Sequence, residues 1–240
     1  MTFPHKLGLR RSPKDSRDLK LCVQPNKFLP LKYDIPIVRC VYAQAYNDCS
    51  ANVICNQIMS LKDWNDTNYP SRLFQYYISR SIGNNEENDE GCSYREAYQG
   101  LAKFGFTDEN FCPYNTSNVL EKPSEEAYNT ANKTLVKKYK SVLQCQYALK
   151  FSICEEHIVA FGSMLFENFE PDVNGNIPLP CGNMVGGHAM AIIGYDDATK
   201  TFKVQNSWGS SWGMNGCCFM KYEHILNPEW CFDFYVITKD

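Results

Sequence analysis

The spacing of apolar residues changes near residue 138, and this change constrains the fold more than any other feature of the chain. Before it, apolar side chains recur at helical spacing in segments that begin near residues 48, 71, 93 and 124. After it, short apolar runs between turn residues predict strands at 158–166, 188–195, 201–206, 217–222 and 232–237. Helices gathered in one half and strands in the other are typical of α+β proteins, not of parallel βαβ units. We therefore expect an α+β fold of two unlike lobes with a cleft between them.

Local signals mark the ends of the predicted helices. Asp48 is predicted as the N-cap of the first helix, since apolar residues follow it at helical spacing. Ser93 and Glu96 form a capping-box pattern, and Gly105 is the kind of residue that ends a helix. Ser124 is followed by two glutamates that would favour the first turn of a fourth helix.

Residues 1–34 differ in character from the rest of the chain. They hold eight Lys or Arg and three Asp, a net charge of +5, whereas the whole chain carries −3. Four prolines interrupt this stretch, so it is predicted as an extended strap lying on an acidic body. About 34 extended residues reach roughly 110 Å at most, which is enough to cross a cleft. The strap is therefore a candidate autoinhibitory segment, with packing against the rear of the body as the alternative.

Composition excludes several classes of protein. A net charge of −3 gives no overall positive field of the kind that attracts nucleic acid. The longest apolar run, residues 189–194, is too short to span a bilayer. The twelve cysteines form no C-x-x-C pair and the four histidines are scattered, so the spacing of a structural zinc site is missing. Residues 1–10 lack the apolar core of a secretory signal, and we expect mostly reduced cysteines.

Three residues in chain order could carry out thiol chemistry. Cys49 falls in the first turn of a predicted helix, where free N–H groups and the helix dipole favour a thiolate. His188 begins an apolar strand after two glycines, and Asn206 ends the next strand before Ser207 and Trp208. Nucleophilic catalysis by a thiol needs a nucleophile, a general base and a group that orients the base. Cys49, His188 and Asn206 would supply these three roles.

These residues and their surroundings resemble the papain/cathepsin-type cysteine peptidases. The resemblance covers residues 35–237 and is closest to the compact forms of bacteria and large DNA viruses, which lack a long prosegment. Its most specific element is Asn206-Ser-Trp-Gly-Ser-Ser-Trp-Gly213. The other matching segments are Gln44 with Cys49–Asn52, Gly91–Ser93, Phe104–Glu109, Pro113-Tyr114, Gly187–Ala189 and Asp233–Tyr235.

The resemblance implies a two-lobed fold, with a helical lobe and an antiparallel, β-barrel-like lobe on either side of the active site. Gln44 would donate to the oxyanion hole together with the backbone N–H of Cys49. Trp208 and Trp212 would shield the hydrogen bond between His188 and Asn206. Substrate would bind as an extended strand, and the residues expected to contact it are Gly91, Cys92, Ser93, Ala160, Gly187, Ala189, Trp208 and Phe232.

The chain departs from the family pattern next to the nucleophile. Five positions separate Gln44 from Cys49, one fewer than is usual in the family, and Ser50 stands where a tryptophan is common. Asp48 replaces a small residue, and its charge would oppose a neighbouring thiolate unless it caps the helix or faces solvent. These departures keep open an impaired relative that only binds peptides or a partner protein. A thiol acyltransferase on the same scaffold is the other alternative.

We expect a thiol endopeptidase that forms a thioester acyl-enzyme and acts on peptide or protein substrates. No cofactor or metal is needed for that chemistry, and neither nucleic acid nor a membrane is expected as a partner. The predicted organisation is a strap at 1–34, a helical lobe at 35–135 carrying the nucleophile, and a β-rich lobe at 136–240 carrying His188 and Asn206. With no signal sequence recognised, an intracellular or virion-associated, reducing location is expected. Oligomeric state is left open.

Overall fold

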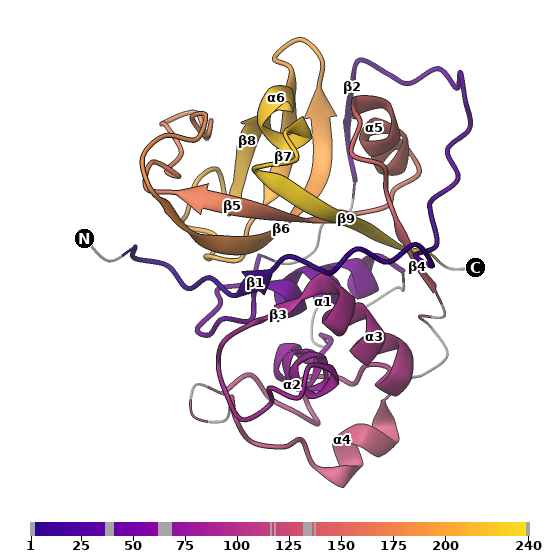
Figure 1. Cartoon of the computed structure of the whole chain (residues 1–240), viewed down its shortest axis with the longest axis vertical. Coiled ribbons are helices and arrows are strands. Elements are labelled where there is room, and N and C mark those ends of the chain that lie inside the picture. The colour runs from indigo at the N-terminus through magenta and orange to yellow at the C-terminus, as the bar shows by residue number, and fades with distance from the viewer. Residues whose placement is uncertain are drawn as a thin grey trace.

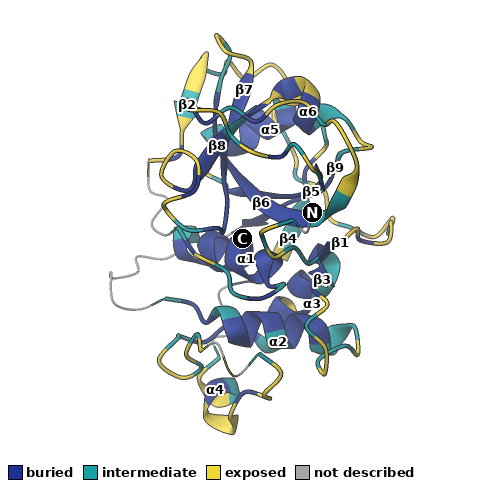
Figure 2. Cartoon of the chain, turned by 90° about the vertical axis from the view of Figure 1, so that its left-hand side faces the viewer, coloured by how far each residue is buried: buried dark blue, intermediate teal, exposed yellow. Residues whose placement is uncertain are grey.

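The computed structural model describes residues 3–36, 41–61, 69–115, 117, 119–131, 136 and 138–238. Four helices form the lower part of the molecule in Figure 1: α1 (Cys49–Leu61), α2 (Arg72–Ile82), α3 (Tyr94–Phe104) and α4 (Glu125–Thr130). The helix α1 lies where this helical part meets the strands, and its residues from Cys49 to Met59 are all buried (Figure 2). A helix buried on all sides is a core element, so α1 is held firmly between the two parts of the protein.

The helix ends follow the local signals in the sequence. The Ser71 and Ser124 side chains accept the N–H groups of Phe74 and Ala127 and so cap α2 and α4. At α3 the capping box is complete, because Ser93 and Glu96 each accept a backbone N–H from the other. These helix starts are confirmed. Their capping groups are close in sequence, which is why the pattern could reveal them.

The upper part of the molecule is a seven-stranded antiparallel sheet. Its strand order is β4-β9-β5-β6-β7-β8, and β2 pairs with β6 beside that path. The strands are β2 (Lys32–Asp34), β4 (Lys138–Ser141), β5 (Val159–Phe166), β6 (Met184–Asp196), β7 (Thr201–Gln205), β8 (Cys217–Lys221) and β9 (Cys231–Thr238). Helices on one side and an antiparallel sheet on the other confirm the expected α+β, two-lobed class.

Two helices in the β-rich half were not predicted, namely α5 (Gln146–Cys154) and α6 (Tyr222–Leu226). In α5 every residue from 148 to 153 is buried. A helix buried on nearly all sides has no polar stripe, so its sequence shows no helical period. Lys150 lies inside this run because its ammonium pairs with Asp197 at 2.5 Å.

The N-terminal strap follows an extended path across the molecule and contains one short strand, β1 (Leu9–Arg10). β1 pairs in parallel with β3 (Cys92–Ser93) of the helical lobe and also contacts β6 of the sheet. It therefore lies in the seam, by which we mean the boundary between β3 and β6. Figure 1 shows the chain crossing this seam and then rising past α5 to β2.

Ion pairs fasten the rest of the strap to the body. Arg95 of α3 holds Asp18 through two hydrogen bonds of 2.6 Å each. Further along, Lys27 pairs with Glu155 after α5, and Lys32 pairs with Asp196 at 3.0 Å. Within the described part of the chain, no helix is long and apolar enough to cross a membrane.

Candidate functional site

The candidate nucleophile is the first residue of α1. The carbonyl oxygen of Asp48 accepts the N–H groups of Ala51 and Asn52, which starts the helix at Cys49. The Cys49 side chain is fully buried, and its sulfur accepts a hydrogen bond from the backbone N–H of Ala189 on β6. Ala189 directly follows His188 on β6, so the candidate nucleophile contacts the strand that carries the candidate base.

The candidate base is hydrogen-bonded to a side-chain amide. Nε2 of His188 lies 2.7 Å from Oδ1 of Asn206, and the same oxygen accepts the N–H of Ser207 at 2.8 Å. Because that oxygen can only accept, Nε2 must carry the proton of the neutral ring. Nδ1 of His188 is buried and has no hydrogen-bond partner among the described residues. This nitrogen is therefore the basic position that can take a proton from a thiol.

Aromatic rings cover this pair. Trp208 stacks on the His188 ring with centroids 4.7 Å apart, and Trp212 meets Trp208 edge-on at 5.2 Å. Burial lowers the pKa of His188 to about 4. The hydrogen bond to Asn206 opposes this shift, and the nearby His5 adds to it. Burial likewise raises the pKa of the Cys49 thiol, and the Ala189 N–H only partly offsets this effect. In this closed arrangement both groups favour their neutral forms.

Gln44 holds a peptide carbonyl of the chain's own strap. Its Nε2 donates to the carbonyl oxygens of Lys6 at 3.1 Å and Tyr46 at 2.9 Å. Its Oε1 accepts the hydroxyl of Ser207 at 2.5 Å, so the amide is fixed from the sheet side. The residue proposed to bind a substrate carbonyl oxygen is thus occupied by a carbonyl of residue 6.

The backbone of the strap is bonded to both walls of the seam. Gly8 donates its N–H to the Gly187 carbonyl at 3.2 Å, and the Gly8 carbonyl accepts the N–H of Cys92 at 2.9 Å. A Cβ on Gly91, whose φ is +76°, would overlap the Gly8 carbonyl group. A Cβ on Gly187 would overlap the Leu9 carbonyl oxygen. These two glycines therefore allow the close approach of a peptide backbone from either side.

Leu9 fills an apolar recess on the sheet side of the seam. Only 4% of its surface is exposed, and its side chain lies against the bare backbone of Gly162 on β5. Phe232 of β9 borders the same glycine, and the Arg11 guanidinium lies 4.5 Å from the Phe232 ring centroid. Burying a leucine side chain stabilises an arrangement by roughly 1.5–3 kcal/mol, so Leu9 is a principal anchor of the strap.

On the N-terminal side of Gly8, the strap covers Trp208 with two aromatic rings. The His5 ring stacks on the indole with centroids 4.0 Å apart, and Phe3 meets it edge-on at 5.9 Å. Sequence reasoning gave His5 no role, because it matches no motif. Its position follows from the path of the strap, which the pattern around residue 5 does not reveal.

The structure brings most of the predicted substrate-contacting residues to the strap. Gly91 and Gly187 flank its backbone, and the pairs Leu9–Cys92 and Arg10–Ser93 form the parallel ladder. Ala189 lies opposite Gly162 on β5. Ala160 lies two residues further back on β5, opposite Ala191 and Tyr235. Gly162, which sequence reasoning missed, is the β5 residue against which Leu9 lies, and the pairing of β5 with β9 shifts register between Ala160 and Gly162.

Asp48 lies directly before α1, at the predicted N-cap position. Its carboxyl group is fully buried, and its Oδ2 accepts the hydroxyl of Tyr114 at 2.8 Å in place of a helix N–H. Burial raises the pKa of Asp48 to about 6, and the Tyr114 hydrogen bond and the Arg72 charge lower it only in part. Among the described residues this side chain accepts no helix N–H, and it does not face solvent, so its charge can oppose a thiolate on Cys49.

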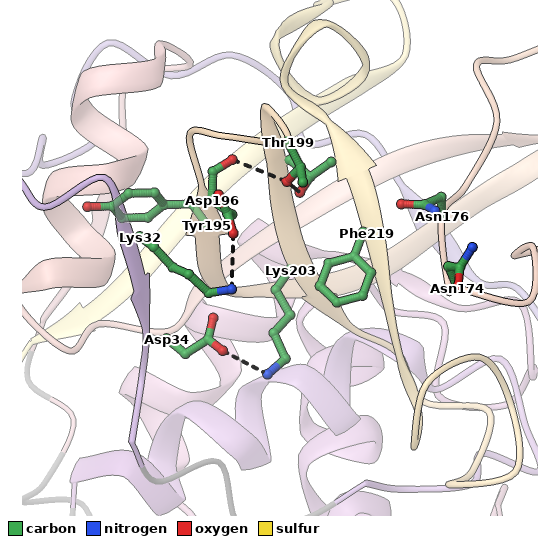
Figure 3. Close-up of a pocket in the computed structure, with 10 residues that line it drawn as sticks. Lys32, Asp34, Asn174, Asn176, Tyr195, Asp196, Thr199, Lys203 and Phe219 are labelled. Atoms are coloured by element: carbon green, nitrogen blue, oxygen red, sulfur yellow. Dashed lines mark hydrogen bonds and ion pairs between the residues drawn. The ribbon is translucent and has the colours of Figure 1, made fainter.

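A second concavity lies on the sheet, away from the seam. It measures about 400 Å³, and Figure 3 shows its two lysines each directed at an aspartate. Lys32 pairs with Asp196 at 3.0 Å, and Lys203 pairs with Asp34 at 3.1 Å. These charges neutralise each other within the pocket. Nowhere in the described ranges do three or more His, Cys, Asp or Glu side chains gather as a metal site, and the eleven cysteines described there are all free thiols.

Comparisons with known proteins point to one family. Residues 77–231 match the model of the papain family cysteine proteases. An uncharacterised peptidase C1-like protein of Acanthamoeba polyphaga mimivirus is 33% identical over 210 residues, which is 80% of this chain and 67% of that protein. A cathepsin B-like cysteine proteinase of Caenorhabditis elegans is 31% identical over 62% of this chain and 47% of its own length. Xylellain, a cysteine protease from Xylella fastidiosa, superposes over the whole of both chains with a TM-score of 0.91 and 28% identity.

Proposed function

The chain belongs to the papain family of cysteine proteases, and on this premise we propose that it is a thiol endopeptidase. In this proposal it hydrolyses peptide bonds through a thioester acyl-enzyme. The helical lobe (35–135) supplies Cys49, and the β-rich lobe (136–240) supplies His188 and Asn206. The observation that carries the proposal is the His188–Asn206 hydrogen bond beside the Cys49 sulfur, with Gln44 already binding a peptide carbonyl.

The proposed reaction has two stages. His188 takes the Cys49 proton at Nδ1, and the sulfur forms a bond to the carbonyl carbon of the substrate. The resulting oxyanion accepts hydrogen bonds from the Gln44 side chain and the Cys49 backbone N–H. When the C–N bond breaks, His188 gives its proton to the leaving amine, and a thioester remains on Cys49.

Water completes the cycle. His188 Nδ1 removes a proton from the water molecule, whose oxygen attacks the thioester carbon. The C–S bond then breaks, the acid product leaves, and the proton returns to the Cys49–His188 pair. Throughout, Asn206 keeps Nε2–H fixed so that Nδ1 faces the reacting atoms.

We also propose that residues 3–12 inhibit the enzyme by occupying its substrate site. Leu9, Gly8 and the Lys6 carbonyl take the recess, the backbone bonds and the Gln44 amide that a substrate would need. The strap also excludes water from Cys49 and His188, which disfavours the thiolate and imidazolium forms. Opening of the strap would restore both access and ionisation.

The experiment that tests the catalytic proposal compares Cys49→Ala with Cys181→Ala. Cys181 is an exposed free thiol outside the seam, so its loss is a matched control for removing a sulfur. We expect Cys49→Ala to abolish hydrolysis of a mixed peptide library read by mass spectrometry, and Cys181→Ala to retain it. Both variants are made in a chain that lacks residues 1–12, and equal, detectable turnover by the two would refute the assignment.

The buried Asp48 favours one alternative, an impaired relative that binds peptides without cleaving them. Its carboxylate next to Cys49 opposes a thiolate. The pH dependence of Cys49 alkylation in a chain shortened by residues 1–12 separates the two functions. Thiolate reactivity that persists near pH 5 supports the enzyme, and an ordinary thiol profile supports the binder.

A further inference from the structure

The loop between Gln44 and Cys49 carries both proposed oxyanion donors, and a single hydroxyl joins its two ends. The Tyr114 hydroxyl accepts the backbone N–H of Ala45 at 2.9 Å and donates to Oδ2 of Asp48 at 2.8 Å. Ala45 is the first residue after Gln44, and Asp48 is the last before Cys49. The oxygen of Tyr114 therefore fixes the span of a loop that is one residue shorter than the family pattern.

Tyr114 is itself held by the helical lobe. The Arg72 guanidinium of α2 lies 3.5 Å from the Tyr114 ring centroid and 4.4 Å from that of Tyr42. Nε of Arg72 donates to Glu109 at 2.7 Å, so the guanidinium is fixed from a second direction. A stacked, paired arginine leaves the tyrosine ring little freedom, and the position of its hydroxyl is thereby set by α2.

The Asp48 carboxyl group is only partly satisfied among the described residues. Its Oδ1 is buried and has no hydrogen-bond partner among the described residues, and Oδ2 contacts the Tyr114 hydroxyl. A buried carboxyl group with one satisfied oxygen is costly, and a neutral small residue would avoid that cost.

We propose that Tyr114 and Asp48 are positioning residues that hold the shortened loop so that Gln44 and the Cys49 N–H converge on one carbonyl oxygen. This inference rests on the proposed function and identifies what adapts the oxyanion loop of this chain. Neither residue contacts the reacting atoms. Their effect passes through the backbone of residues 45–48.

Asp48 also places a negative charge beside the nucleophile when its carboxyl group is ionised. The titratable and charged groups that face Asp48 are Cys49, Tyr46, Tyr114 and Arg72. Above the Asp48 pKa of about 6, a carboxylate beside Cys49 opposes the thiolate, and below it this opposition disappears. Asp48→Asn removes the charge but keeps an oxygen that accepts from Tyr114, so the variant separates charge from positioning.

The test compares Tyr114→Phe with Tyr42→Phe in the full chain. Tyr42 is a matched control because the same arginine lies over its ring, and its buried hydroxyl lies 3.3 Å from the Met59 sulfur. Tyr114→Phe is expected to lower kcat by roughly 10–100-fold with KM within about threefold, since misplacing a catalytic donor acts on the transition state. Tyr42→Phe is expected to change kcat less than about threefold.

Hydrogen exchange of the loop provides a readout that needs no turnover. Tyr114→Phe removes the acceptor of the Ala45 N–H, so deuterium uptake by residues 44–49 should increase, and Tyr42→Phe should leave it unchanged. Asp48→Asn should keep more of kcat than Asp48→Ala, because the amide oxygen can still accept from Tyr114. In the wild-type chain kcat should decline as the pH rises through about 6 and Asp48 ionises, and in Asp48→Asn this decline should be absent. Equal uptake in the two tyrosine variants, or equal kcat, overturns the proposal. If neither the wild-type chain nor a chain lacking residues 1–12 cleaves any peptide, the endopeptidase proposal fails, while loop exchange still decides whether Tyr114 positions the loop.

Discussion

One side chain, Leu9, allows the binding of the strap in the seam to be weakened selectively. Leu9→Ala leaves every strap backbone bond in place but removes three carbon atoms from a side chain that is only 4% exposed. Each buried CH₂ group contributes about 0.8 kcal/mol, so the closed state should lose roughly 2.4 kcal/mol relative to the open state. At 1.4 kcal/mol per tenfold change, the ratio of closed to open molecules should fall roughly 50-fold.

The assay is hydrolysis of a fluorogenic peptide by the full-length chain at pH 7, compared with a chain that lacks residues 1–12. The Leu9→Ala variant should gain activity by up to roughly 50-fold, with the shortened chain as the upper limit. Leu31→Ala is the matched control, because Leu31 belongs to the same strap but is 73% exposed, and its activity should stay within about twofold of wild type. Leu9→Ala turnover equal to wild type, beside a faster shortened chain, would refute the role given to this leucine. No gain in either chain would refute inhibition by the strap.

Two further predictions concern the same equilibrium. Gly8→Ala should activate the full-length chain at least as strongly as Leu9→Ala does, because its new Cβ would overlap the Asn47 carbonyl oxygen. Lys6→Ala alters an exposed side chain and should not activate the chain. The peptide assay above measures both variants. Acidification should also open the strap: the closed state holds the pKa of His188 at about 4, below its ordinary 6.5, so it binds fewer protons than the open state between these values. Lowering the pH from 6.5 towards 4 should therefore favour the open state by up to about tenfold per pH unit, and an activity ratio of full-length to shortened chain that stays constant over this range would contradict the prediction.

The helical half of the fold could be predicted because its determinants are local. Ser71, Ser93 and Ser124 each cap a helix through a backbone N–H three residues away, so the signal and the structure occupy the same few residues. The α+β class and the family were equally accessible, since the order of helices, strands and motifs survives in the sequence. By contrast, α5 was missed because its burial on nearly all sides removes the polar stripe that marks a helix.

The surroundings of the candidate nucleophile could be predicted only in part. The type and order of Cys49, His188 and Asn206 follow from motifs, but the partner of Asp48 is Tyr114, 66 positions away in the chain. Sequence spacing carries no information about such a contact. For this reason the position of Asp48 before the helix could be predicted, and the burial of its carboxyl group against a tyrosine could not.

The path of the strap shows why an inhibitory segment and a substrate place the same demands on this seam. Gly91 and Gly187 lack side chains where the backbone of Gly8 and Leu9 passes, and any extended peptide entering the seam needs the same clearance. A substitution at Gly91 or Gly187 would therefore prevent both the strap and a substrate from binding in the seam. Gly8 differs, because its clearance is required by the strap alone, against Asn47. Selective release of the enzyme must consequently come from changes in the strap itself, and the wall residues are constrained by catalysis as well as by inhibition.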